Sequence, residues 1–417
     1  MPFCTASPPL PDRGGPVTDV ILVLNAGSSS LKFAVYPKTE GANSPLLRGK
    51  ISGIGTKPVF SARDAAGLEL LQHGFAPIDP KTTADGLIPN LLDWVQAHLS
   101  GATICAAGHR VVHGGPHHAG PAVVTKTLLS DLEALVPLAP MHQPHNLAAI
   151  RCLAAKAPDM PQVACFDTSF HHTQDRLAQI FALPRALTDE GIIRYGFHGL
   201  SYEYIASTLP SYLGNRADGR VVVAHLGSGA SICAMQNQRS VATSMGLTVL
   251  DGLMMGRRCG TLDPGVVLYL MEEKHMSAQQ IKTLLYRQSG LLGVSGISND
   301  MATLEQTDAP EAKQAIDLFC YRAAREVASL AVTIGGLDAL IFTAGIGENS
   351  ATVRADICAR LRWMGVRIEA AANVQNAARL SPRGADIEVL VIPTDEETII
   401  AQATRALTCG AGAAAQT

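Results

Sequence analysis

The sequence carries little net charge and no long apolar run, and both absences exclude classes of partner. Lys and Arg number 33 and Asp and Glu number 36, which gives a formal charge of −3. So small a charge provides no overall attraction to nucleic acid or to an anionic membrane, so any anion site must be local. The apolar runs end well short of the roughly 18 residues that a membrane-spanning helix needs. We expect no nucleic-acid partner and no membrane partner.

Paired cysteines and a secretory leader are also missing. The nine cysteines are odd in number and include no C-x-x-C, which indicates neither a disulfide framework nor a zinc site. Five prolines stand among the first sixteen residues, where a secretory signal would have a continuous apolar segment. We expect a flexible proline-rich tail over residues 1–18 and a cytoplasmic location. Cys165, in an apolar run, is predicted to be a buried structural thiol rather than a nucleophile.

Four common catalytic or nucleotide-binding motifs are absent. There is no G-x-x-x-x-G-K-[ST] and no G-x-G-x-x-G, so neither the P-loop nor the dinucleotide fingerprint is present. There is likewise no H-E-x-x-H and no G-x-S-x-G, the usual signatures of zinc proteases and serine hydrolases.

The chain does contain the pattern of an α/β protein with more than one domain. A length of 417 residues with 47% hydrophobic residues predicts two or three domains with sizeable cores. Runs rich in Val, Ile and Leu alternate with helical patterns, which is typical of helices packed on mostly buried sheets. Helical spacing over 312–333 and 351–364 predicts two packing helices.

Two similar segments lie 200 residues apart and indicate a duplication. Residues 19–33 (DVILVLNAGSSSLKF) and 220–235 (RVVVAHLGSGASICAM) each consist of an apolar strand, a Gly/Ser turn and a second apolar strand. Gly27 corresponds to Gly227, and Ser28 to Ser228. We expect two domains that each open with a hairpin, whose backbone N–H groups could together bind one polyphosphate. A third Gly-rich turn, in the segment 339–349 (ALIFTAGIGEN), is expected to follow an apolar strand and precede a helix that begins near residue 350 or 351.

Several charged or polar side chains stand at the ends of predicted strands. Arg110 precedes a Gly-Gly turn and can offer a planar fork to a carboxylate or phosphate, or form a surface ion pair. Asp167 follows an apolar strand, where α/β folds place ligand-facing residues, although it could also cap a helix. His198 stands between Phe and Gly, and Arg258 follows Arg257 in a Met/Gly-rich loop. The acidic run 395–397 supplies either hard oxygen ligands for Mg²⁺ or a helix N-terminal charge cluster.

The order of these motifs resembles that of the acetokinase family. NAGSSSLKF, GHRVVHGG, FDTSFH, RYGFHG, HLGSGAS, TSMG with MGRRCG, SGISND, GIGEN and PTDEE occur in the family's order between residues 21 and 404. The resemblance implies an α/β fold of two duplicated domains of the actin-like (Hsp70-like, RNase H-like) ATPase architecture with an interdomain cleft, and a homodimer. It divides the chain into an acyl-binding lobe, 19–168 completed by 397–417, and a nucleotide-binding and dimerisation lobe, 169–396.

The resemblance also implies a role for each motif residue. Asn25 and Glu396 would hold Mg²⁺, with Mn²⁺ as an alternative, and Asp167 would be the catalytic carboxylate, most simply by holding Mg²⁺ or its waters. His198 and Arg258 would stabilise the transition state, and Arg110 would bind the acyl carboxylate. The acyl methyl pocket would consist of Val112, Met141 and Phe197. The nucleotide residues would be Lys32, His225, Leu226, Gly227, Ser228, Gly229, Asp300, Met301, Ala302, Gly345, Ile346, Gly347, Glu348 and Asn349.

The implied activity is reversible phosphoryl transfer between ATP and acetate, giving ADP and acetyl phosphate. Ser228, Val249 and Ala302 replace the Asn, Pro and Arg that are usual in the family, and Gln143, Tyr202 and Thr261 are further departures. They leave propionate or butyrate open as acceptor, because one methylene discriminates by only about 1 to 3 kcal/mol, and pyrophosphate open as donor. An actin-like or chaperone-like ATPase switch and a degraded binding protein are the alternatives from other classes.

Overall fold

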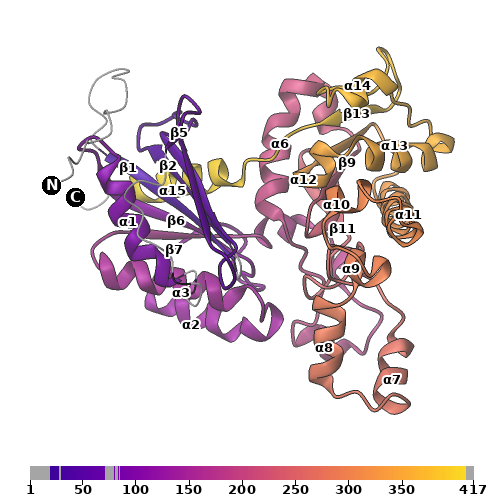
Figure 1. Cartoon of the computed structure of the whole chain (residues 1–417), viewed down its shortest axis with the longest axis horizontal. Helices are drawn as coiled ribbons and strands as arrows, with labels where there is room; N and C mark the ends of the chain where they lie inside the picture. Colours follow the sequence, from indigo (N-terminus) through magenta and orange to yellow (C-terminus); the bar gives the residue numbers. More distant parts are fainter. Residues whose placement is uncertain (1–18, 28–29, 71–78, 80–82, 84, 410–417) are drawn as a thin grey trace. The chain divides into compact units, whose positions relative to one another are not determined.

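The computed structural model describes residues 19–27, 30–70, 79, 83 and 85–409 (Figure 1). The expected tail, 1–18, and Ser28 lie outside the described residues. The described residues up to Ser169 and those from Asp395 onward form one compact unit, unit 1. Phe170–Thr394 form the second, unit 2. The sequence-based boundaries after residues 168 and 396 therefore compare with observed ones after Ser169 and Thr394.

Unit 1 is built on an eight-stranded mixed sheet with the order β5-β4-β3-β2-β1-β6-β8-β7. The strands are β1 (Asp19–Ala26), β2 (Ser30–Pro37), β3 (Leu47–Ser52), β4 (Val59–Asp64), β5 (Glu69–Leu70), β6 (Thr103–Val111), β7 (Ala122–Val123) and β8 (Gln162–Phe166). Strands β1 to β5 form an antiparallel meander, and β1, β6 and β8 are parallel. The expected first hairpin is therefore present as β1 and β2.

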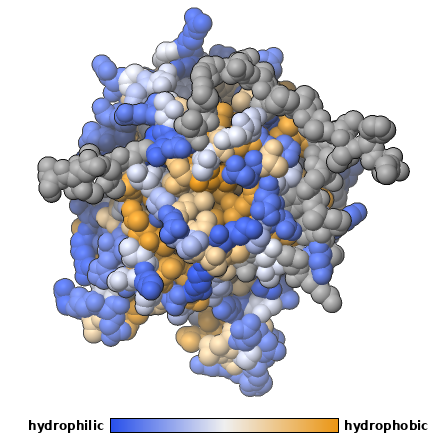
Figure 2. Space-filling model, turned by 90° about the vertical axis from the view of Figure 1, so that its left-hand side faces the viewer, coloured by the Kyte–Doolittle hydropathy of each residue, from blue (hydrophilic) through white to orange (hydrophobic). Residues whose placement is uncertain are grey.

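Helices cover both faces of this sheet. They are α1 (Ile88–Ala97), α2 (Lys126–Ala134), α3 (Gln143–Lys156) and α15 (Glu396–Cys409), with short 3₁₀ turns at Asp85–Leu87 and Val136–Leu138. Because side chains alternate along a strand, Leu22 and Leu24 of β1 enter the core that α1 and α3 close, whereas Asn25 points to the α15 side. Helix α15 packs on β1, β6 and β8, as Figure 1 shows. On the face of unit 1 seen in Figure 2, hydrophobic residues gather toward the middle and hydrophilic residues surround them.

A glycine lets α15 approach β6 closely. A Cβ at Gly108 would overlap the side chains of Thr404 and Ile400 on α15. The next position along β6 on the face covered by α15 is Arg110, which therefore points to the first turn of the same helix. This close packing sets where Arg110 meets the acidic start of α15.

Unit 2 repeats the strand arrangement of unit 1. Its sheet has the order β11-β10-β9-β12-β13, with β9 (Val221–Leu226), β10 (Ala230–Gln236), β11 (Arg239–Thr243), β12 (Ala339–Thr343) and β13 (Glu388–Val391). Strands β9, β10 and β11 are antiparallel, and β9, β12 and β13 are parallel. Strands β3-β2-β1-β6-β8 of unit 1 have the same order and the same directions. The expected α/β fold with a duplicated strand arrangement is confirmed. Unit 2 does not open with its hairpin, because helical segments from Ser169 to Asp218 precede β9.

The helices of unit 2 are α4 (Arg176–Gln179), α5 (Arg185–Asp189), α6 (Gly199–Leu213), α7 (Pro264–Glu272), α8 (Ala278–Arg287), α9 (Gly290–Ser295), α10 (Met301–Glu305), α11 (Pro310–Thr333), α12 (Ala344–Asn349), α13 (Ala351–Arg360) and α14 (Ala370–Val374). Three further 3₁₀ turns are Ser169–Thr173, Gly214–Asp218 and Arg362–Met364. Helix α11 packs on α9, α13 and the sheet. Among the described helices, none combines the length and apolar character needed to cross a bilayer.

One expected turn is wrong, and one expected helix ends early. The segment 344–349 forms the short helix α12 directly after β12, because the Glu348 carboxylate accepts a hydrogen bond from the Ala344 N–H and closes a helical turn. Helix α13 begins at Ala351 with Ser350 as its N-cap, as predicted. It ends at Arg360, and a 3₁₀ turn continues to Met364, where the pattern predicted a single helix over 351–364.

Candidate active site

Four of the sequence-predicted residues meet at one edge of the unit 1 sheet. The Arg110 guanidinium binds both carboxylate oxygens of Asp167, with Nε to Oδ1 at 2.9 Å and Nη2 to Oδ2 at 2.6 Å. Its Nη1 donates to Asn25 Oδ1 at 3.3 Å. Glu396 Oε2 accepts from Asn25 Nδ2 at 3.3 Å and lies 3.9 Å from Arg110 Nε. The strand ends of β1, β6 and β8 and the first turn of α15 thus hold one connected polar cluster.

This cluster contains three ionisable side chains, Arg110, Asp167 and Glu396, although each is mostly buried. Asp167 is 1% exposed, and a carboxylate charge buried to this extent is costly unless it is paired and hydrogen-bonded. Burial opposes the charge on Arg110, but the carboxylates of Asp167 and Glu396 outweigh it and raise the pKa of the guanidinium above its usual range. Arg110 therefore remains a cation, and its two-point contact fixes the orientation of the Asp167 carboxylate.

The oxygen atoms of this cluster suit a hard divalent cation. Mg²⁺ takes one or two carboxylates, keeps several waters and completes its shell with substrate phosphates. Asn25 and Glu396 are hydrogen-bonded neighbours that supply an amide oxygen and a carboxylate, and the Asp167 carboxylate binds the same Arg110 guanidinium as Asn25 does. Within the described part of the chain, no group of three or more His, Cys, Asp or Glu side chains could hold a metal by itself. The donor set thus fits a hard metal ion that would take its remaining ligands from water or from a bound substrate.

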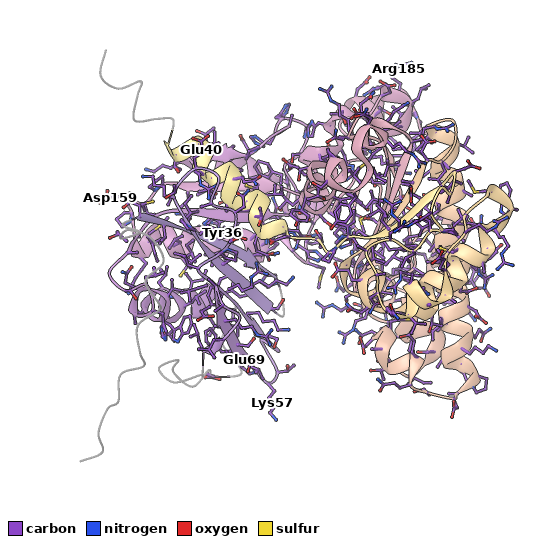
Figure 3. All side chains as sticks on the ribbon, turned by 90° about the horizontal axis from the view of Figure 1, so that it is seen from above. Tyr36, Glu40, Lys57, Glu69, Asp159 and Arg185 are labelled. Carbon is purple, nitrogen blue, oxygen red and sulfur yellow. The ribbon has the colours of Figure 1, made fainter. Side chains whose placement is uncertain are left out.

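Lys32 lies beside this cluster on the same face of the sheet. It pairs in register with Asn25 across the β1–β2 hairpin, and directly paired residues share a face. It lines a cavity of about 430 Å³ over β2, β3 and β4 that also includes Tyr36 and Glu69, both labelled in Figure 3, and the carboxylate of Glu397. Burial raises the pKa of Glu397, and the positive charge of Lys32 opposes that rise.

The start of α3 supports the predicted acyl-binding residues of unit 1. The Val112 N–H donates to Asn146 Oδ1 at 3.0 Å, and Asn146 Nδ2 donates to the Ala26 carbonyl at 2.6 Å. Gln143, fully buried, accepts from the His113 N–H and donates to the His113 carbonyl. Gln143 is a departure from the family pattern that the sequence left without a role. Its longer side chain spans both backbone groups of His113, so it orients the backbone next to Val112.

In unit 2, the turn between β9 and β10 is packed against two other Gly-rich segments. The Gly227 N–H donates to the Gly229 carbonyl at 3.0 Å, and the Gly256 N–H donates to the Ser228 carbonyl at 3.1 Å. A Cβ on Gly227 would lie 3.6 Å from Ala344 Cβ, at the start of α12. The predicted phosphate loop, 225–229, therefore lies next to the predicted nucleotide segment 345–349.

The two predicted transition-state residues come together over this loop. A Cβ on Gly229 would lie 2.7 Å from Arg258 Nη2 and 3.3 Å from His198 Nε2, so a side chain there would have to displace the Arg258 guanidinium. Arg258 is held by its Nη1, which donates to the Val249 carbonyl at 2.6 Å. His198 has φ +59°, a strained conformation for a residue other than glycine, and strain of this kind is concentrated at functional sites.

Two other predicted positions have modest surroundings. Asp300 caps α10, with its Oδ2 accepting from the Thr303 N–H at 3.0 Å, and Met301 is buried while Ala302 is exposed. Arg257 is exposed and donates to Asn299 Oδ1 at 3.3 Å, so it lies apart from the contact that Arg258 makes. Val112 and Met141 belong to unit 1, whereas the fully buried Phe197 belongs to unit 2.

Arg354 is a supporting residue that the sequence did not reveal. This arginine on α13 is 0% exposed, and its Nη1 donates to the carbonyls of Gly347 and Glu348 at 2.9 and 3.0 Å. Its Nε and Nη2 donate to Asn373. It therefore holds the carboxyl end of α12 in place. A single Arg in a helical pattern carries no signal for this role, because its partners come from two other segments of the chain.

Known proteins match this chain over nearly its whole length. Residues 20–402 match the model of the acetokinase family. An acetate kinase of Rhodopseudomonas palustris is 52% identical over 391 residues, which cover 93% of this chain and 98% of the relative. An acetate kinase of Methylocella silvestris is 48% identical over 398 residues, covering 93% and 97%.

Solved structures agree with the sequence matches. A propionate kinase of Francisella tularensis superimposes with a TM-score of 0.85 at 36% identity, covering 93% of this chain and all of that one. The acetate kinase of Porphyromonas gingivalis gives 0.82 at 32% identity, with 94% and 100% covered. With its duplicated sheets, its charged cluster in unit 1 and its glycine loop in unit 2, this chain belongs to the acetokinase family.

Proposed function

We propose that this protein is an acetate kinase that catalyses the reversible, Mg²⁺-dependent transfer of a phosphoryl group from ATP to acetate. The cluster of Asn25, Arg110, Asp167 and Glu396 is the observation that carries this proposal, because it combines a guanidinium for a carboxylate with oxygen ligands for a metal. In the forward direction an acetate oxygen forms a bond to the γ-phosphorus, and the bond to the β,γ-bridging oxygen breaks. ADP leaves with that electron pair.

The main barrier is electrostatic, since both reactants are anions. Arg110 would bind the acetate carboxylate through the part of its guanidinium that Asp167 does not occupy. Asn25 and Glu396 would hold Mg²⁺, which supplies charge neutralisation at the phosphates. Acetate has an acidity near that of Glu, with a pKa of roughly 4.3, and is already ionised at pH 7. Asp167 therefore has no proton to remove, and it would orient Arg110 and the metal's waters.

Unit 2 would supply the donors for the transferred group. Arg258 and His198 both face Gly229, so a phosphoryl oxygen at the loop would meet a cation and an imidazole together. Removal of one such preorganised donor typically costs about 10²-fold to 10³-fold in kcat. Arg354 would act indirectly by holding α12 beside the loop.

We propose acetate rather than propionate as the acceptor, because the relatives with 52% and 48% identity are named acetate kinases, whereas the propionate kinase is 36% identical. Val249 would influence the choice of acceptor most directly. It is buried, and its carbonyl accepts a hydrogen bond from Arg258. A change in the acyl pocket at Val249 is therefore coupled to the position of a catalytic cation.

The activity is tested by trapping acyl phosphate with hydroxylamine, using purified protein, Mg-ATP and acetate, propionate or butyrate in parallel. We expect hydroxamate that depends on acceptor and Mg²⁺, is largest with acetate, and falls at least about 100-fold in Arg258→Ala. Arg257→Ala is the matched control, since this neighbouring side chain is exposed and bonds only Asn299 among the described residues. No hydroxamate with any acceptor, despite bound ATP, would refute the proposal.

A homodimer is the assembly that we propose, through α7. No residue of α7 is buried, although the helix reads PGVVLYLME, and Leu268, Tyr269 and Met271 are each about half exposed. Exposed apolar side chains gathered on one helix favour a protein–protein contact. A second copy of the chain is the partner that the family resemblance implies.

A further inference from the structure

His198 is anchored from behind by two buried hydroxyl groups. Ser231 Oγ lies 2.8 Å from His198 Nδ1 and 2.5 Å from the Tyr202 hydroxyl. Ser231 and Tyr202 are 0% exposed. Tyr202 projects from α6, the helix that His198 caps, and Ser231 is the second residue of β10, just after the phosphate loop. All three residues belong to unit 2.

The hydroxyl hydrogens in this chain of hydrogen bonds, from Tyr202 through Ser231 to His198, can be assigned to acceptors. Burial raises the pKa of Tyr202 well above its ordinary range, so the phenol keeps its hydrogen. In the described part of the protein, Ser231 Oγ is the only hydrogen-bond partner of that phenol. If Tyr202 donates to Ser231, the serine hydrogen has one remaining acceptor, His198 Nδ1. This arrangement gives both hydroxyl hydrogens an acceptor.

The other tautomer, with the hydrogen on His198 Nδ1, leaves one hydroxyl hydrogen without an acceptor. If His198 Nδ1 carried the hydrogen and donated to Ser231, either the serine or the tyrosine hydrogen would be buried and unpaired. A buried donor without a partner costs about 1–3 kcal/mol. That cost corresponds to a tautomer ratio of roughly 5 to 150, because 1.4 kcal/mol is a factor of ten in an equilibrium.

We propose that Ser231, oriented by Tyr202, is a positioning residue that keeps neutral His198 in the tautomer with its hydrogen on Nε2. The catalytic role of this tautomer, though not the tautomer itself, rests on the proposed function. Nε2 faces Gly229 and Arg258, so this tautomer presents an N–H donor to a phosphoryl oxygen at the loop. The other tautomer would present a lone pair to that anion and would repel it. The surrounding groups are Arg258, Tyr202 and the ring of His225, stacked on His198 at 4.3 Å.

The structure contains an internal reference for this tautomer. His171 Nε2 lies 3.0 Å from the Phe197 carbonyl oxygen, which can only accept, so its hydrogen must be on Nε2. Burial lowers the pKa of His171 to about 4, so it is neutral near pH 7. The nitrogen-15 signals of His171 therefore define the pattern that His198 should share.

The decisive experiment is nitrogen-15 NMR of histidine-labelled protein at pH 7.5, with His198 assigned by its absence in His198→Gln. We expect wild-type His198 to match His171, and Ser231→Ala to lose that bias. Ser231→Thr, which keeps the hydroxyl, should restore it, and Tyr202→Phe should show a weaker bias. Ser381→Ala is the matched control, because it removes another buried serine hydroxyl, bonded to Glu388 at 2.6 Å, without contact to His198.

Kinetics provide the second readout. We expect Ser231→Ala to lower kcat about tenfold or more while KM for ATP and for acetate stay within about twofold, because the lost donor acts on the transferring group. Wild-type His198 with its hydrogen on Nδ1, or a Ser231→Ala variant with unchanged spectrum and kcat, would overturn the inference. If wild type makes no acyl phosphate but the spectra behave as expected, the proposed function fails and the assignment of the tautomer stands.

Discussion

Arg110 and Asp167 form a two-point ion pair in which the Arg110 side chain is 21% exposed and the Asp167 side chain 1% exposed. The pair joins the ends of β6 and β8, two parallel neighbours in the sheet. Its asymmetry in exposure means that the carboxylate depends on the guanidinium, whereas the guanidinium keeps an open side. The same contact thus stabilises unit 1 and orients the proposed acetate-binding group.

Removal of Arg110 should therefore affect stability as well as catalysis. Breaking a buried pair by removal of one partner costs about 3–5 kcal/mol, because a buried charge is left uncompensated. We expect Arg110→Gln to lower the free energy of unfolding by about 3 kcal/mol and kcat by at least about 100-fold. Urea unfolding and the hydroxamate assay measure the two effects. Arg151→Gln is the control, because Arg151 forms an exposed ion pair with Glu133. Full stability in Arg110→Gln would contradict this account.

Glu396 should determine the dependence on Mg²⁺. We expect Glu396→Gln to raise the Mg²⁺ concentration for half-maximal activity about tenfold or more, because a neutral amide is a poorer ligand for a hard cation than a carboxylate. Glu397→Gln tests the adjacent residue, which lines the cavity with Lys32, whereas Asn25 hydrogen-bonds Glu396. Titrations with Mg²⁺ at saturating ATP compare the two. Equal shifts in both variants would argue against a ligand role for Glu396.

Gly229 should tolerate no side chain. A Cβ there would displace Arg258 or His198, so Gly229→Ala should lower kcat about 100-fold without unfolding unit 2. Gly120→Ala is the matched substitution, because a Cβ at Gly120 has no atom within 4 Å. Steady-state kinetics and circular dichroism decide the outcome. An active Gly229→Ala enzyme would mean that Arg258 and His198 need not share the loop.

Stability should fall in mild acid because of two buried histidines. Burial lowers the pKa values of His109 and His171 from 6.5 to about 4. Below pH 6.5 the unfolded chain therefore binds protons that the folded chain does not, and the free energy of unfolding falls as pH falls toward 4. Each histidine should cost about 2 kcal/mol at pH 5 relative to pH 7. Urea unfolding at both pH values should show this loss, and His109→Gln should remove about half of it. An equal pH dependence in that variant would point to other groups.

Assembly should depend on α7. Leu268→Asp places a charge in the proposed dimer contact, and we expect sedimentation to change from dimer to monomer. Leu177→Asp, at a residue of α4 that is 86% exposed, is the control and should remain dimeric. A wild-type protein that sediments as a monomer would rule out the proposed contact.

Local pattern was sufficient to predict the fold class and the two hairpins, whereas the roles of the site residues were implied by the resemblance to the acetokinase family. Apolar runs on either side of a Gly/Ser turn predicted both hairpins. The position of Asp167 directly after a strand was also predicted correctly. Helix α12 was missed, because a glycine-rich run favours turns until a side chain such as Glu348 closes the helix. The bond that does so is made within the folded segment and has no periodic signature.

Partnerships between distant residues were decided by tertiary structure alone. Asn25 meets Glu396 across 371 positions because strand alternation turns it toward α15 and a glycine at 108 lets that helix approach the sheet. Ser231 and Tyr202 look like ordinary core residues in the sequence, yet their buried hydroxyl groups meet behind His198. Residue type and spacing specify which chemistry a chain can carry. The packing of strands and helices specifies which groups share a hydrogen, a charge or a metal, because those interactions act only over a few ångströms.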